Sequence, residues 1–150
     1  MPIDDANLLR VLAEVLVRQA HPTEVDDMGR VMTPAFKSSK RHDFSLSVTM
    51  SSQIDPRLAT KQFLKLDLLT HSAWGVSVEE FHSVGMKAYN DPDAQIDAHA
   101  VVDQKPLGSS ALKKAATRLG EYARSRGCLC IASEIVDPDP TAPTVDATSS

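Results

Sequence analysis

Apolar and polar side chains alternate most regularly between Asp43 and Met50. Positions 44, 46, 48 and 50 are apolar, and positions 45, 47 and 49 carry hydroxyl groups. Successive side chains of a strand point to opposite faces, so this period predicts a strand with one buried and one polar face. A hydroxyl-bearing face is typical of a solvated sheet, and it is also a suitable wall for a ligand pocket.

Three longer segments have the apolar spacing of helices. Residues 4–19 place four apolar side chains on one helical stripe (Leu8, Leu12, Val15 and Leu16), and we expect this helix to end at His21-Pro22. A second helix is predicted from Asp55-Pro56 to about residue 69, with the acid as N-cap and the proline at the first helical position. A third is predicted after a lead-in at residues 106–110, and we expect it to end at Gly127.

The strongest local signal is a capping box. Ser77 and Glu80 have the required spacing, and Val76 and Phe81 have the positions of a hydrophobic staple. These residues predict a short helix over residues 78–84, with Gly85 in a left-handed conformation just past its end.

Further strands are expected at residues 30–36, where Pro34 weakens the pattern, and at residues 86–90, 97–103 and 128–132. Helices and strands therefore do not alternate strictly along the chain. This order favours an α+β fold, a mostly antiparallel sheet with about three to four helices packed on one face of it. A chain of this length suits one domain, which we assign to residues 1–132.

Charge is distributed unevenly, and the net charge is -4. Of the 20 acidic residues, four lie in residues 133–150, which contain no Lys or Arg, so residues 1–132 carry 16 acidic and 16 basic side chains. A nearly neutral body argues against a broad nucleic-acid surface. Residues 133–150 are rich in Pro, Thr, Ser and Asp, and we expect a disordered acidic tail.

Cysteine usage and hydropathy indicate a cytoplasmic protein. Cys128 and Cys130 are one residue apart, a poor spacing for a mutual disulfide, so reduced thiols are expected. The N-terminus lacks the pattern of a secretory signal, and no apolar run approaches the ~20 residues of a membrane span.

Several short motifs resemble, in their order and spacing, a family of small bacterial proteins with no assigned activity. The motifs that carry the resemblance are Arg18-x-x-His21-Pro22, Ala35-Phe36-Lys37, Leu46-Ser47-Val48, Gly85-Met86, Asp91-Pro92 and Ala98-His99-Ala100. The resemblance covers roughly residues 15–125 and implies an intact fold of that family, but no reaction.

Residues in and near these motifs have the chemistry of a ligand site. An imidazole can act as acid or base near neutral pH, an arginine can hold a phosphate or carboxylate, and a serine hydroxyl can donate a hydrogen bond. His21 and His99 are therefore candidate catalytic residues, and Arg18, Ser47 and Asp27 are candidate ligand-binding residues. Together they would suit a phosphorylated or nucleotide-like ligand.

The same residues can also be interpreted as having purely structural roles. Arg18 would cap the last carbonyls of the first predicted helix, His21 would lie in the turn after it, and His99 would be an ordinary strand histidine. No metal site is expected, because the chain has none of the usual zinc spacings, and no cofactor is expected either.

Two hypotheses about function follow. The first is a non-catalytic binding or accessory protein that acts on a protein partner encoded nearby, through the sheet or the last helix. It rests on the lack of a catalytic signature. Two basic clusters could contact an anionic partner: Lys37, Lys40 and Arg41, and Lys113, Lys114, Arg118 and Arg124. The second hypothesis is a small enzyme or binding domain in which Arg18, His21, Ser47 and His99 share one cleft.

Deletion of residues 133–150 should leave the melting temperature nearly unchanged, because so few of these residues can be buried. Thermal unfolding followed by circular dichroism measures this. A decrease of more than a few degrees would show that part of the segment packs on the domain.

Overall fold

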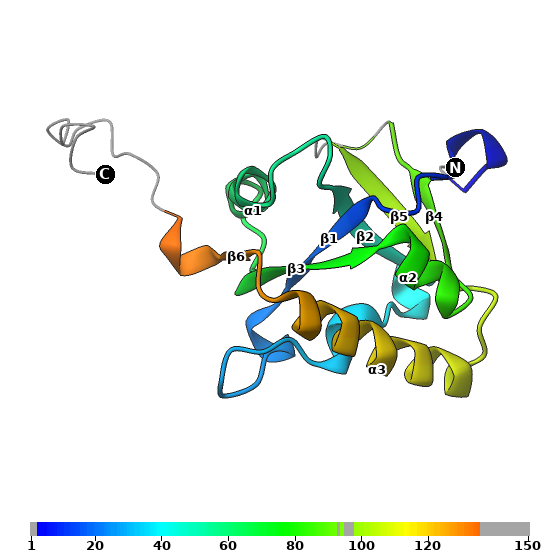
Figure 1. Cartoon of the computed structure of the whole chain (residues 1–150). Helices are drawn as coiled ribbons and strands as arrows, with labels where there is room; N and C mark the ends of the chain where they lie inside the picture. Colours follow the sequence, from blue (N-terminus) through cyan, green and yellow to red (C-terminus); the bar gives the residue numbers. More distant parts are fainter. Residues whose placement is uncertain (1–2, 93, 95–97, 136–150) are drawn as a thin grey trace, which may run out of the picture.

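The structure is a computed structural model that describes residues 3–92, 94 and 98–135 (Figure 1). Its centre is a six-stranded sheet of order β4-β5-β2-β1-β3-β6, in which every neighbouring pair is antiparallel. The strands are β1 (Val15–Ala20), β2 (Ser45–Met50), β3 (Ser72–Ser77), β4 (Lys87–Asn90), β5 (His99–Asp103) and β6 (Cys130–Ile131). The α-helices of the described part are α1 (Pro56–Lys65), α2 (Val78–Ser83) and α3 (Ser109–Arg126). The predicted α+β class with a mostly antiparallel sheet is confirmed.

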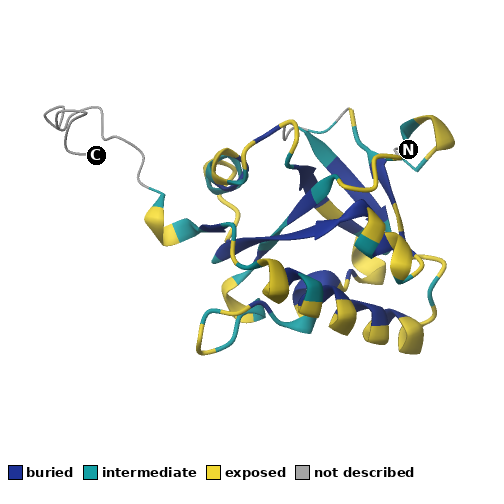
Figure 2. Ribbon diagram, viewed as in Figure 1, coloured by how far each residue is buried: buried dark blue, intermediate teal, exposed yellow. Residues whose placement is uncertain are grey.

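Helices cover both faces of the sheet rather than one (Figure 1). α2, α3 and a 3₁₀ turn at Thr33–Phe36 pack on the face that holds the main core, where Leu16, Val48 and Trp74 are buried. α1 lies on the opposite face, where Thr60 bonds to Gln19 of β1. Figure 2 shows the sheet buried and the outer side of α3 exposed. The expectation that the helices share one face is therefore wrong.

The first predicted helix is also wrong, because its last residues, from Val15 on, belong to a central strand. A 3₁₀ turn occupies Asp5–Asn7, and β1 begins at Val15. Leu16 faces the main core, and Val17 is buried in a smaller cluster on the other face. A strand covered on both faces has a nearly continuous apolar run, which periodicity alone cannot separate from a buried helix.

The strands of the structure differ from the predicted ones in two further respects. Residues 30–36 form no strand: Val31 makes one isolated bridge with Val25, and Pro34 lies in the first turn of the 3₁₀ segment, where its fixed φ is tolerated. β3 was not predicted from the sequence. Its six residues are all buried, so they do not alternate, and Gly75 interrupts the pattern.

Several predicted elements are confirmed. β2 buries Leu46, Val48 and Met50 on one face, but it begins at Ser45 rather than Asp43, because Asp43 and Phe44 have positive φ. The capping box forms, with Ser77 Oγ accepting from Glu80 N at 3.1 Å and Glu80 Oε1 accepting from Ser77 N at 2.8 Å. α1 ends at Lys65, about four residues earlier than expected, and α3 ends at Arg126 as expected.

Contacts continue past the predicted end of the domain. Ile135 packs against the Val17 cluster, and Arg57 Nη2 donates to the Glu134 carbonyl at 3.2 Å. Truncation before Ser133 therefore also removes these contacts, whereas truncation after Ile135 isolates the effect of residues 136–150. Those last residues, which make up most of the predicted tail, lie outside the described part of the chain.

The described helices and the two cysteines bear on membrane insertion and on disulfide formation. None of their helices is long and apolar enough to span a bilayer. Cys128 and Cys130 are free thiols, and burial raises the pKa of the Cys128 thiol.

Replacing Ser77 by Ala should lower the free energy of unfolding by about 1 kcal/mol, because the Glu80 amide loses its acceptor. The expected change in melting temperature is roughly 3 °C. Urea denaturation measures the free energy, and Ser125→Ala at an exposed position of α3 is the control. Equal stability of the two variants would show that the capping box contributes nothing measurable.

Candidate functional site

The two central strands of the sheet pair over a short distance and then separate. β1 and β2 are in register only at Leu16 with Met50 and at Val17 with Thr49. By contrast, β1 pairs with β3 over six residues, and β2 pairs with β5 over five. The second half of β1 and the first half of β2 therefore leave a gap in the middle of the sheet.

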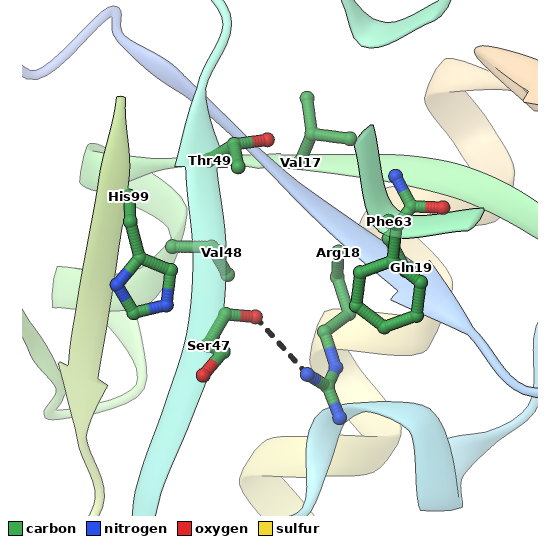
Figure 3. A pocket seen from close by; sticks show the side chains of 8 residues that line it. All are labelled: Val17, Arg18, Gln19, Ser47, Val48, Thr49, Phe63 and His99. Atoms are coloured by element: carbon green, nitrogen blue, oxygen red, sulfur yellow. Dashed lines mark hydrogen bonds between the residues drawn. The ribbon is translucent and has the colours of Figure 1, made fainter. Parts of the chain in front are cut away.

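Arg18 fills this gap. Its Nε donates to the Ala35 carbonyl at 2.8 Å, and its Nη1 donates to the Ser47 carbonyl at 3.0 Å (Figure 3). Burial lowers the pKa of Arg18, and the nearby Glu24 carboxylate opposes this shift only in part. An arginine side chain stays protonated in proteins, so the guanidinium group keeps its charge at neutral pH. A partly desolvated cation thus lies between the separated strands.

Ser47 presents a second hydrogen-bond donor to the same gap. Its carbonyl points toward β1, as the bond from Arg18 shows. The N–H and C=O of one strand residue point to the same side, so the Ser47 N–H also faces the gap. The described β1–β2 ladder stops at Thr49 and gives this N–H no partner. The gap therefore offers a cation and a backbone donor close to each other.

His99 is oriented by a carboxylate. Its Nδ1 lies 2.9 Å from Asp91 Oδ2, and the two side chains are only 14% and 21% exposed. The hairpin of β4 and β5 sets this contact, since the Asp91 N–H also donates to the His99 carbonyl at 2.9 Å. A carboxylate on Nδ1 favours a proton on that nitrogen and leaves Nε2 for another partner.

Thr49 contributes a hydroxyl group without a partner. Thr49 pairs with His99 across β2 and β5, so both side chains lie on the α1-bearing face. The residue is 8% exposed, and Thr49 Oγ1 has no hydrogen-bond partner among the described residues. An unpaired buried hydroxyl costs roughly 1–3 kcal/mol. Buried polar groups normally have a hydrogen-bond partner, and this hydroxyl is free to bond to a ligand.

These side chains line one small pocket (Figure 3). Its lining residues are Val17, Arg18, Gln19, Ser47, Val48, Thr49, Phe63 and His99, and its volume is about 30 Å³. A bound water needs about 10–15 Å³, so the pocket has space for roughly two oxygen-sized atoms. It can accept the anionic end of a ligand, and the remainder of that ligand would lie outside.

The candidate residues from the sequence are divided between two places. Arg18, Ser47 and His99 line the pocket, but His21 and Asp27 do not. His21 instead caps a 3₁₀ turn at Pro22–Glu24, where its Nδ1 accepts from the Thr23 amide at 3.1 Å. The interpretation of Arg18 as a helix cap is wrong, because it lies in a strand.

Sequence reasoning missed two members of the site, Asp91 and Thr49. Asp91 could have been found from the predicted hairpin, because pairing residues 86–90 with 97–103 brings Asp91 opposite His99. Thr49 was recognised only as part of the hydroxyl face. No sequence signal shows that its hydroxyl would be buried without a partner.

Neither metal-binding geometry nor a known relative identifies the site. Within the part of the chain that the structure describes, no three His, Cys, Asp or Glu side chains are grouped so that they could hold a metal ion. Comparisons with protein-family models, with curated proteins and with solved structures found no match.

Replacing Arg18 by Met should lower the free energy of unfolding by about 1–3 kcal/mol, because the Ala35 and Ser47 carbonyls lose their donor. Arg41→Met removes the same charge from an exposed position of the 3₁₀ turn at Lys40–His42 and should change stability by less than about 0.5 kcal/mol. Urea denaturation of the two variants tests this. Similar midpoints for both would contradict a structural role for Arg18 in the gap.

Proposed function

We propose that the protein binds a small-molecule ligand by its anionic end, a phosphate or a carboxylate, in the pocket between β1 and β2. Arg18 supplies the positive charge, and the Ser47 amide and the Ser47 and Thr49 hydroxyls supply neutral donors. Arginine forms strong charge-assisted hydrogen bonds with both kinds of anion. The pocket volume limits the buried portion to one or two oxygens of the ligand.

The observation that carries this proposal is that an unpaired hydroxyl, that of Thr49, and a partly desolvated cation, Arg18, line the same pocket. Either feature alone has a structural explanation. In one pocket, a ligand oxygen can accept from the hydroxyl, and an anionic group can pair with the guanidinium, whose charge Glu24 compensates only in part.

His99 is the acid–base residue of the proposed site. With Nδ1 on Asp91, its Nε2 can accept a proton from a hydrogen phosphate or hydroxyl group, and it can donate one when the ring is protonated. A phosphorylated ligand thus fits the site better than a fully ionised carboxylate, which has no proton to give.

The proposal is tested by titrating ¹⁵N-labelled protein with inorganic phosphate and, separately, with acetate, at constant ionic strength. We expect saturable shifts of the Arg18, Thr49 and His99 resonances, with a lower dissociation constant for phosphate. Shifts that follow ionic strength alone, or that occur elsewhere in the molecule, would contradict the proposal.

Replacing Thr49 by Val should have opposite effects on stability and binding. Removing the unpaired hydroxyl should raise the free energy of unfolding of the free protein by about 1 kcal/mol, and losing a donor to an anion should weaken phosphate binding about tenfold. Urea denaturation and phosphate titration measure the two effects.

The control is Ser38→Ala. Ser38 is about as buried as Thr49, but its hydroxyl donates to Gln104 Oε1 at 2.7 Å outside the pocket, so this variant should be less stable and should bind phosphate normally. Unchanged phosphate affinity in Thr49→Val would remove Thr49 from the site.

A further inference from the structure

A second recess lies outside the pocket, in the groove between α2 and α3. Its apolar lining comes from Val84, just after α2, from Leu107, and from Ala111 and Ala115 on α3. Its volume is about 440 Å³, far more than that of the pocket between the strands. A recess of this size and lining can take aliphatic side chains of a bound segment.

Two cations border this groove. Lys114 and Arg118 are one helical turn apart on α3, and both are exposed. Neither forms an ion pair within the described residues, whose ion pairs involve other side chains. The basic edge of the groove is therefore available to an anionic group.

Arg118 is held in place at the groove. Its guanidinium carbon lies 5.7 Å from the centre of the Tyr122 ring, within range of a cation–π contact. Tyr122 is fixed in turn, since its hydroxyl lies 3.3 Å from Ser83 Oγ of α2. The Ser83 contact and the Arg118 charge lower the pKa of Tyr122. A cation that is already ordered loses less entropy when it binds an anion.

From these contacts we infer that the α2–α3 groove binds a short acidic segment of a partner protein, in which acidic and aliphatic side chains are interspersed. The aliphatic side chains occupy the apolar lining, and the acidic ones pair with Lys114 and Arg118. The stretch of α3 from Lys114 to Tyr122 is about 12 Å long, which an extended segment of about four residues can cover.

A protein segment fits this groove better than a nucleic acid does. Few cations border the groove, Glu121 lies on the same helix, and the chain carries a net charge of -4. A phosphate backbone needs an extended basic surface. The apolar lining also offers nothing to sugars and phosphates.

The test is a titration of ¹⁵N-labelled protein with an eight-residue peptide of alternating Glu and Leu, to millimolar concentration. We expect amide shifts at Val84, Leu107 and Ala111, and a dissociation constant at least tenfold higher for Lys114→Glu with Arg118→Glu. The matched control, Lys37→Glu with Lys40→Glu, changes the charge equally at exposed positions outside the groove and should bind normally.

Three outcomes would overturn the inference: no shifts at millimolar peptide, equal binding of an alternating Lys and Leu peptide, or tighter binding of single-stranded DNA at the same residues. Both double variants are surface changes, so circular dichroism should show the same fold for each. Shifts at Arg18 and Thr49 on phosphate addition report on the other pocket, and the two proposals can fail separately.

Discussion

The guanidinium group of Arg18 connects parts of the fold that do not pair through their backbones. β1 and β2 separate after two residue pairs, and the side chain of Arg18 replaces the missing ladder at the Ser47 carbonyl. It also bonds to the Ala35 carbonyl, in the 3₁₀ turn that packs on α3. One side chain thus ties together two central strands and a layer of the core. Its removal would leave two backbone acceptors without a donor, and the Ala35 carbonyl is partly buried.

The candidate site exists because the Arg18 side chain, rather than backbone hydrogen bonds, connects β1 and β2 at Ser47. A continuous β1–β2 pairing would use the Ser47 N–H and exclude any ligand from between the strands. The gap instead leaves a donor, a cation and the hydroxyl of Thr49 around one small space. Asp91 orients His99 at its edge. Fold and proposed function therefore depend on one residue, Arg18, and its replacement would affect both.

Short sequence patterns correctly predicted the elements that have chemically different faces or a local capping interaction. Residues 45–50 have one buried and one polar face, and the Ser77–Glu80 capping box is a purely local interaction, so both were predicted correctly. β1 and β3 are covered on both faces, and their sequences do not show the alternation that identifies a strand. Arg18, Ser47 and His99 were identified by their chemistry. Their convergence depends on the order of strands in the sheet, which no local pattern contains.

The most direct test of the account is the hydrogen-exchange rate of the Ser47 amide, measured by NMR with and without phosphate. This amide faces the gap and has no partner in the β1–β2 ladder, so it should exchange faster than the neighbouring Val48 amide in the free protein. Bound phosphate should slow its exchange and move its proton resonance downfield. A slowly exchanging Ser47 amide that phosphate leaves unchanged would show that the gap is closed, and it would contradict both the structural role of the gap and the proposed site.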